Sequence, residues 1–293
     1  MGNSRDIKKR MKAVSNIKRI TRTMQMIATS KFAKAQQASQ ATRPYTDALF
    51  GLVAQLSNAG VGENHPLLAD RDLDTDREQT LVITAERGLC GPYNGSIVRT
   101  ALRHLRETTG AADGPIDVVG KKGAATLRFN GYRDFTHHTH FGETPRFEDI
   151  ERLAQSYIDA FVAGDIAAVR VVYMKYFSAG KQRPEVLQLL PFQTPEPEGD
   201  DADSGFSDVY EFSPDAESLL DHLLPAAVKS TLFQCFNDAV VSEHIARMIA
   251  MQAATDNAGK MGQALKREFN RARQAQITTE LSEIISGVNA LEN

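Results

Sequence analysis

Residues 7–27, IKKRMKAVSNIKRITRTMQMI, carry the pattern that decides the fold of this chain. Their apolar side chains recur at spacings of three and four residues, which places them along one face of an α-helix. The stripe is formed by Ile7, Met11, Val14, Ile17, Ile20, Met24 and Ile27. Asn3 or Ser4 can cap the start of the helix. The pattern predicts a long N-terminal helix that packs one apolar face against another element.

Helix-compatible sequence extends over both ends of the chain. Residues 4–59 contain one proline, Pro44, and one glycine, Gly51, while residues 215–293 contain one proline, Pro225. An α-helix rises about 1.5 Å per residue, so either end could reach roughly 80 to 100 Å. The C-terminal end repeats the apolar stripe at Val241, Ile245, Met248, Ile249, Leu265, Phe269, Ile277, Leu281, Ile284, Val288 and Leu291.

We expect these two stripes to pack on each other as an antiparallel coiled coil. Their spacing is not a strict heptad, so the predicted pair is loosely wound and is not a regular zipper. When the two ends of one chain pair to form a rod, a mechanical role is favoured over a catalytic one.

Strands alternate with helices between the two ends. Short β-branched runs predict strands, and amphipathic stretches between them predict helices, which together indicate parallel βαβ units. The expected strands are 79–85, 116–119, 167–177 and 185–190, and the expected helices are 96–107, 120–129 and 148–161. The predicted fold is α/β, with a long antiparallel coiled coil of N- and C-terminal helices plus a central Rossmann-like α/β domain. We expect shaft helices at 1–59 and 214–293, a linker at 60–77 and the α/β domain at 78–213.

Charge is distributed unevenly along a chain whose formal net charge is only −3. Residues 5–43 hold eleven Lys and Arg but a single acidic residue, Asp6. Such a one-sided helix favours an acidic partner surface over a merely solvated face. Acidic residues gather near Asp200 among prolines and glycines, which predicts a solvated loop with no assigned function.

The composition excludes several classes of protein. Cys90 and Cys235 are the only cysteines, so no disulfide framework is implied. No apolar run approaches the roughly 18 residues that span a bilayer, and the basic N-terminus lacks the apolar segment of a secretory signal. We expect a cytoplasmic protein that can still dock on a membrane complex.

Two glycine patterns resemble phosphate-binding loops without matching them. Gly88 and Gly91 follow a strand and precede a helix, but the third glycine of a dinucleotide fingerprint is missing. Gly114 and Gly120 stand one residue too far apart for a Walker loop, and Lys122 replaces the required hydroxyl. We therefore expect no cofactor-binding residues.

No metal site or catalytic arrangement is recognisable either. His137, His138 and His140 lack a cysteine or carboxylate at ligand spacing, and an exposed strand explains them better. The pattern from Asp201 to Gly205 fails the calcium-loop consensus. No Ser, His and Asp arrangement can be assembled, so the sequence predicts no catalytic residue and no metal ligand.

Several stretches together resemble the γ subunit of bacterial F-type ATP synthases. Residues 19–31 (RITRTMQMIATSK) are similar to the first helix of that family, and residues 84–91 (TAERGLCG) to the turn after its first central strand. Residues 246–257 (ARMIAMQAATDN) and 270–287 (NRARQAQITTELSEIISG) are similar to its last helix. Pro92 and Tyr93 stand where the family often has glycine and leucine, so the local turn is expected to differ.

The resemblance implies a non-catalytic rotor shaft without cofactors. It implies partners in the α and β subunits of the catalytic hexamer, the ε subunit and the membrane c-ring. It also implies a peripheral position on the cytoplasmic face of the bacterial inner membrane. Rotation driven by ion flow would change the β sites in turn, where ATP is made or hydrolysed.

The same resemblance identifies residues where the shaft would contact or couple to the catalytic ring. Met24 is adaptable in its packing and lies within the basic first helix. The set of partner-contact residues is Met24, Arg10, Arg19, Arg22, Lys31, Arg247, Arg273, Gln274, Thr278 and Glu280.

Two other functions stay open at this stage. A basic coiled coil could bind nucleic acid through phosphates, with steep salt dependence. A nucleotide-dependent enzyme could be built on the central domain, although the glycine patterns argue against it. The sequence does not indicate whether protons or sodium ions drive rotation, how hydrolysis is inhibited, or what His137, His138 and His140 do.

Overall fold

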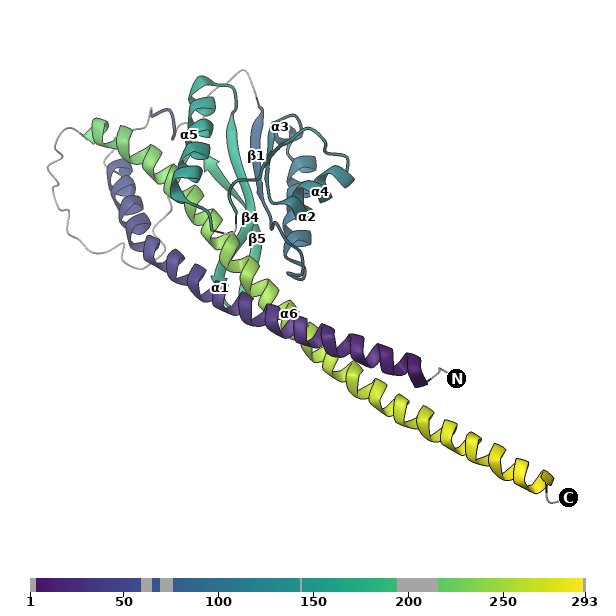
Figure 1. Cartoon of the computed structure of the whole chain (residues 1–293). Helices are drawn as coiled ribbons and strands as arrows, with labels where there is room; N and C mark the ends of the chain where they lie inside the picture. Colours follow the sequence, from purple (N-terminus) through teal and green to yellow (C-terminus); the bar gives the residue numbers. More distant parts are fainter. Residues whose placement is uncertain (1–3, 59–64, 69–75, 143, 194–215, 292–293) are drawn as a thin grey trace. The chain divides into compact units, whose positions relative to one another are not determined.

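The computed structural model describes residues 4–58, 65–68, 76–142, 144–193 and 216–291. Contacts divide the chain into two compact units, Met1–Thr29 with Arg247–Asn293, and Ser30–Ala246. Two long helices, α1 (Ser4–Asn58) and α6 (Ala216–Leu291), supply segments to both units (Figure 1). The predicted long terminal helices are therefore confirmed. The acidic stretch near Asp200 and most of the predicted linker lie outside the described residues.

The helical segments of the first unit run antiparallel, as predicted. Ser4 Oγ donates to Gln276 Oε1 at 3.1 Å, and Thr255 Oγ1 donates to Thr21 Oγ1 at 2.8 Å. Sequence numbers therefore rise along α1 as they fall along α6. We call this unit, residues 4–29 and 247–291, the two-helix unit.

The seam of the two-helix unit differs from the predicted one. Its buried positions on α1 are Ile7, Val14, Thr21 and Ala28, each seven residues after the last. On α6 the buried positions are Met251, Thr255 and Ala258. The expectation of a non-heptad seam was wrong, because small and polar residues that an apolar count omits complete the repeat. A consequence is that Ile17, Ile20 and Ile27, expected in the seam, are 51%, 54% and 51% exposed.

The α/β unit is built on a five-stranded sheet in the order β3-β2-β1-β4-β5. The strands are β1 (Glu78–Ile83), β2 (Ile116–Val119), β3 (Thr136–His138), β4 (Ala168–Ser178) and β5 (Lys181–Leu190). The first four strands pair in parallel, which confirms the predicted βαβ units. Strand β5 begins before the predicted residue 185 and pairs antiparallel with β4. Pro184 is tolerated there because β5 is an edge strand.

Helices cover both faces of this sheet (Figure 1). On one face lie α2 (Tyr93–Glu107), α3 (Thr109–Ala112) and α4 (Lys121–Phe129). On the other face α5 (Phe147–Ala163) packs with segments of α1 and α6 into one apolar core. Within the part of the chain that the structure describes, no helix is long and apolar enough to cross a membrane.

A buried ionic cluster lies where β1, β4 and α2 meet. Glu78 Oε2 is 3.5 Å from both His104 Nε2 and Arg170 Nε. Burial lowers the pKa of His104, Glu78 opposes that shift in part, and Arg170 adds to it. The folded chain therefore holds fewer protons than the unfolded chain just below the usual pKa of 6.5.

Acid is expected to destabilise the chain through His104. Because the pKa is lowered in the folded state, stability is complete above about pH 6.5 and falls as the pH drops below that value. His104→Gln removes the titrating group, so its urea midpoint should change less between about pH 7.5 and pH 5.5 than that of the wild type. The exposed control His140→Gln should retain the wild-type response. An equal acid response in His104→Gln would contradict the assignment.

Candidate partner-binding surface of the two-helix unit

The two-helix unit carries a strongly basic surface. Residues 4–29 and 247–276 together hold fourteen Lys and Arg against three acidic residues. Arg10, Arg19 and Arg22 are exposed and form no ion pair with any described residue. Like charges along one helix repel each other unless a partner neutralises them, so this surface is suited to an acidic neighbour.

Met24 stands beside an exposed apolar stripe on the same helix. Its side chain is half-buried, whereas Ile17, Ile20 and Ile27 are more than half exposed. The spacing of 17, 20, 24 and 27 follows one helical face next to the buried seam. Met24 therefore packs in part at the edge of the seam, and the rest of its side chain is accessible to another molecule. Exposed apolar side chains that gather in a stripe indicate a protein contact.

The candidate residues on α6 are mostly exposed as well. Thr278 Oγ1 donates to the Gln274 carbonyl at 3.0 Å, and Gln276 Nε2 donates to Glu280 Oε1 at 2.9 Å. Arg273 and Gln274 are exposed, and within the described residues their side chains form no hydrogen bond or ion pair with another helix. These bonds along the helix hold Glu280 and Thr278 in place on its surface.

The predicted contact residues do not converge on one point. Arg10, Arg19, Arg22 and Met24 follow each other along α1, over about 20 Å at 1.5 Å per residue. Arg247 is half-buried in the two-helix unit, and the half-buried Lys31 belongs to the α/β unit. The residues of the set that lie in the two-helix unit are therefore spread along its helices and do not form one compact site.

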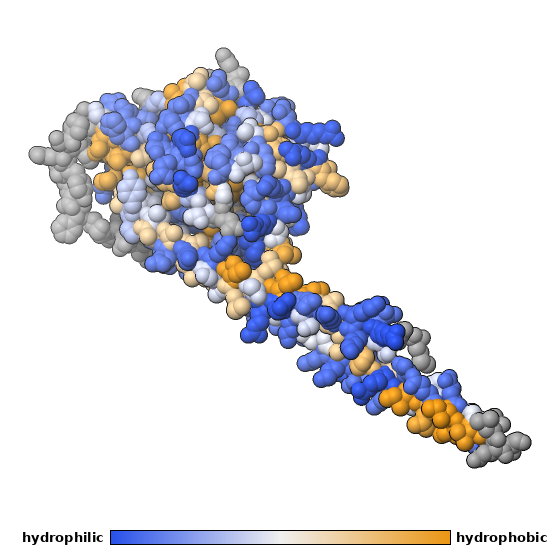
Figure 2. All heavy atoms as spheres, viewed as in Figure 1, coloured by the Kyte–Doolittle hydropathy of each residue, from blue (hydrophilic) through white to orange (hydrophobic). Residues whose placement is uncertain are grey.

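The last turns of α6 form a feature that the sequence did not reveal. The described part of α1 starts at Ser4, beside Gln276, and α6 continues to Leu291. We call residues 277–291 the tip, which is about 22 Å long. Figure 2 shows hydrophobic side chains gathered at this end. Its exposed apolar residues are Ile277, Leu281, Ile284, Ile285 and Val288. Four of them were expected in the seam, and that expectation was wrong because no described residue of α1 reaches them.

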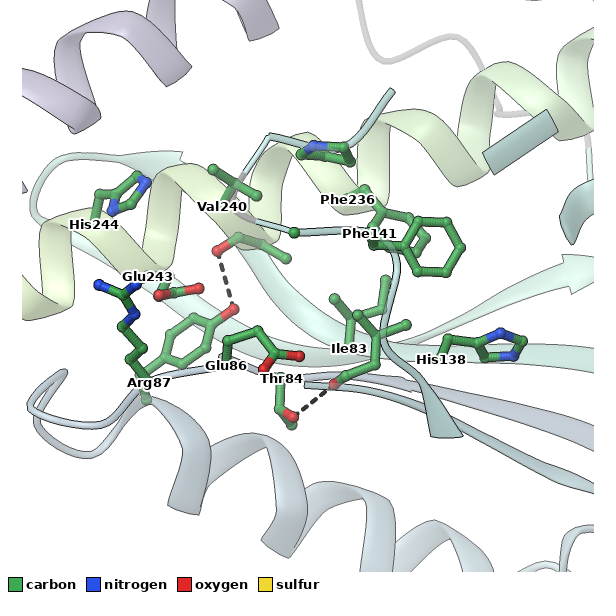
Figure 3. Close-up of a pocket in the computed structure, with 15 residues that line it drawn as sticks. Ile83, Thr84, Glu86, Arg87, His138, Phe141, Phe236, Val240, Glu243 and His244 are labelled. Carbon is green, nitrogen blue, oxygen red and sulfur yellow. Dashed lines mark hydrogen bonds between the residues drawn. The ribbon is translucent and has the colours of Figure 1, made fainter. Parts of the chain in front are cut away.

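The α/β unit contains a small cavity at the carboxyl edge of its parallel strands (Figure 3). Such edges are where ligands bind in open α/β sheets. The volume of this cavity is about 30 Å³, whereas ligand pockets span roughly 300 to 1,000 Å³. Phe141 and Phe236 fill one end, and Tyr93 donates to the Ala239 carbonyl at 3.0 Å. A nucleotide does not fit this space.

The helix terminus that would cradle a phosphate is also occupied. Gly123 N donates to Thr84 Oγ1 at 3.0 Å, and Lys122 N donates to the Ala85 carbonyl at 3.2 Å. These N–H groups open α4, the helix that follows the second strand, and the N-terminus of a helix is a general place for an anion to bind. A Cβ on Gly123 would meet Thr84 Oγ1 at 2.4 Å, so the helix and the strand end are in close contact.

The histidines behind this edge have structural contacts. His138 Nε2 lies 3.3 Å from Asp117 Oδ2, which also accepts a 2.6 Å bond from the Tyr157 hydroxyl. Burial and the neighbouring carboxylate of Asp117 raise the pKa of Tyr157. His138 ends β3 and His140 follows it, and the part of the chain that the structure describes shows no cluster of three potential metal ligands.

A pair of long helices with an exposed basic surface and an exposed apolar stripe is typical of a structural component of a larger assembly. Comparison with known proteins agrees. A family model described as ATP synthase matches residues 3–291. The ATP synthase γ chain of Rhodopirellula baltica is 42% identical over the full length of both chains. That of Desulforamulus reducens is 37% identical over the full length of both.

Solved structures share the fold. The rotor of the mitochondrial ATP synthase of Euglena gracilis has a TM-score of 0.61 and 17% identity, over 94% of this chain and 98% of that chain. A central stalk and c-ring structure from Tetrahymena thermophila has a TM-score of 0.54 and 19% identity, over 80% of this chain and 99% of that one. The chain belongs to the ATP synthase γ-chain family.

Proposed function

We propose that this chain is the central rotating stalk of a bacterial F-type ATP synthase. Its two-helix unit would turn inside a ring of three α and three β subunits and transmit torque between ion flow and ATP chemistry. The observation that carries the proposal is the rod of paired helices in a member of the γ-chain family. Two packed helices resist bending better than one, which an axle requires.

The basic surface supplies the contact with the ring. Arg10, Arg19 and Arg22 are exposed and lack an ionic partner among the described residues, so an acidic segment of each β subunit can pair with them in turn. Exposed ion pairs contribute about 0 to 1 kcal/mol each, so the shaft can leave one subunit for the next. We assign the same contact role to Met24, Lys31, Arg247, Arg273, Gln274, Thr278 and Glu280.

The tip supplies the bearing. Its apolar side chains are about half exposed, and beyond Arg273 the helix has no basic residue. An apolar collar formed by the α and β subunits would bury these side chains without fixing one rotational position. Hydrophobic contact suits a bearing because it is not directional.

The α/β unit would lie on the membrane side, against the ε subunit and the c-ring. This placement makes the chain a peripheral protein on the cytoplasmic face of the inner membrane. Catalysis would reside in the β subunits, so the chain acts by changing their conformations and thereby regulates ATPase activity.

The isolated chain is expected neither to bind nor to hydrolyse ATP. The cavity at the strand edge is small, and the Thr84 hydroxyl already accepts a hydrogen bond from one of the N–H groups that open α4. Calorimetric titration with ATP and magnesium should show no binding in the micromolar range. A one-to-one isotherm would restore the enzyme hypothesis.

Single-molecule rotation tests the proposal itself. The catalytic hexamer is fixed to a surface, and a bead is attached to a cysteine introduced by Asp134→Cys, at an exposed residue in the loop after α4. ATP should drive rotation of the bead in one direction. Hydrolysis without rotation, in complexes that contain the chain, would refute the role of a rotating shaft.

A further inference from the structure

Helices α2 and α4 lie side by side over one face of the sheet (Figure 1). Their inner sides pack together through Val98 and Leu105 of α2 and Ala124 and Leu127 of α4. This packing fixes the orientation of both helices, so their outer sides form a rigid, continuous surface.

That outer surface is rich in arginine. Arg99, Arg103 and Arg106 are exposed at spacings of four and three, which places them on one side of α2. Four more exposed basic residues continue the surface over and beyond α4, namely Lys121, Lys122, Arg128 and Arg133. The exposed acidic residues between 93 and 134 are Glu107, Asp113 and Asp134.

Most of these charges have no ionic partner among the residues that the structure describes. The three arginines of α2 form no ion pair with any described residue, although Glu107 is four residues from Arg103. Lys121 pairs with Glu86 at 3.4 Å, and the Arg128 guanidinium lies 5.0 Å from the centre of the Phe135 ring. Guanidinium groups that pair with no carboxylate among the described residues are available to a carboxylate on another molecule.

An apolar anchor adjoins the arginines. Phe129, the last residue of α4, is 91% exposed. A single exposed aromatic residue is not unusual, but protein interfaces are enriched in aromatic residues and arginine and depleted in lysine. This surface has five arginines, two lysines and the exposed phenylalanine, which is the composition of an interface.

We propose that the outer side of α2 and α4, which we call the arginine face, docks an acidic surface of another protein in the same complex. The proposal rests on the proposed function, because it requires that the chain works within a multi-subunit assembly. Guanidinium groups bind carboxylates through two parallel hydrogen bonds, so arginines spaced along α2 select a partner with carboxylates at matching intervals.

A protein fits this face better than an anionic membrane does. Lipid headgroups are bound as well by lysine as by arginine, and interfacial helices insert a row of apolar residues. The described part of the arginine face offers one fully exposed apolar residue, Phe129. The chemistry therefore favours carboxylates that are fixed on a folded partner.

Zero-length crosslinking identifies the partner. The intact rotary complex carrying Arg103→Lys is treated with a carbodiimide, which joins an amine to a carboxylate only where the two touch. Mass spectrometry should find position 103 joined to an Asp or Glu of another subunit. A complex that assembles and hydrolyses ATP normally but yields no such crosslink would overturn the proposal while leaving the proposed function intact.

Charge reversal measures the contribution of the face. Combined Arg99→Glu, Arg103→Glu and Arg106→Glu should raise the dissociation constant of the crosslinked subunit roughly 100-fold at low salt. Arg146→Glu, an exposed arginine on the α5 side, should leave it unchanged. If the triple variant loses helical content, the arginine-to-glutamine triple replaces it. If the folded triple variant binds the crosslinked subunit with unchanged affinity, the proposal is refuted. It is also refuted if the triple variant loses binding to phosphatidylglycerol vesicles but keeps its affinity for the subunit.

Discussion

Assembled enzyme that carries Met24→Lys is expected to hydrolyse ATP at an appreciable rate while it pumps few ions per ATP. Met24 is half-buried at the edge of the seam, next to the exposed side chains of Ile20 and Ile27. In the proposed function, a lysine at this position would extend an amine beyond the apolar stripe toward an acidic segment of a β subunit. One charge-assisted hydrogen bond contributes roughly 0.5 to 3 kcal/mol.

If the proposed function holds, the rotating shaft would have to break this added contact at every rotational step. A contact of about 1.4 kcal/mol slows escape from one position tenfold, so transmission suffers more than chemistry. Hydrolysis and ion pumping are measured in the same vesicles, with Met26→Lys as the matched control. Met26 is on the same helix and is 58% exposed, so its lysine can extend into solvent. Gln274→Ala is expected to weaken the contact between the shaft and the catalytic ring at a second position. Combined with Met24→Lys, it should partly restore pumping. Equal loss of hydrolysis and pumping would show that Met24 has no coupling role.

The terminal helices and the sheet could be predicted from the sequence because their signals are local. Apolar spacing, β-branched runs and the near absence of proline from both ends each report on a few neighbouring residues. The seam between the helices could not be read the same way. Thr21 and Thr255 share a 2.8 Å hydrogen bond within it, and a polar residue looks like a surface position until its partner is known.

The candidate surface was predictable only in part. The basic residues of α1 stand out by composition, and the structure places Arg10, Arg19 and Arg22 in solvent. The exposure of Ile277 and Ile284 was not predictable, because it depends on where the partner helix starts. An apolar stripe has the same spacing whether it packs within its own chain or binds another protein.

Buried polar groups were the least predictable. Asp117 lies within a strand whose other residues are apolar, and its contacts come from β3 and α5, 21 and 40 residues away in sequence. Thr84 blocks the start of α4 through a bond to Gly123, 39 residues on. Glycine spacing in the sequence does not reveal this contact.

Paired acidic substitutions in the tip are expected to weaken the hold of the catalytic ring on the shaft at least tenfold. Leu281 and Ile284 are 54% and 66% exposed in the chain by itself, so Leu281→Asp with Ile284→Asp should leave its folding unchanged. In the assembled enzyme the same side chains would be buried in an apolar collar. Full burial of each contributes about 1.5 to 3 kcal/mol, which the double variant loses while it also places charges in an apolar site.

The position of the added charges distinguishes this cause from a change in net charge. Ser282→Asp with Ser286→Asp adds the same two charges on the opposite side of α6, away from Leu281 and Ile284. Release of the shaft from the hexamer is followed by native mass spectrometry as the temperature rises. The Leu281 and Ile284 variant should release it at lower temperature than the wild type, and the serine variant should not. If both double variants behave alike, charge in general weakens the assembly and the apolar bearing assigned to the tip is wrong.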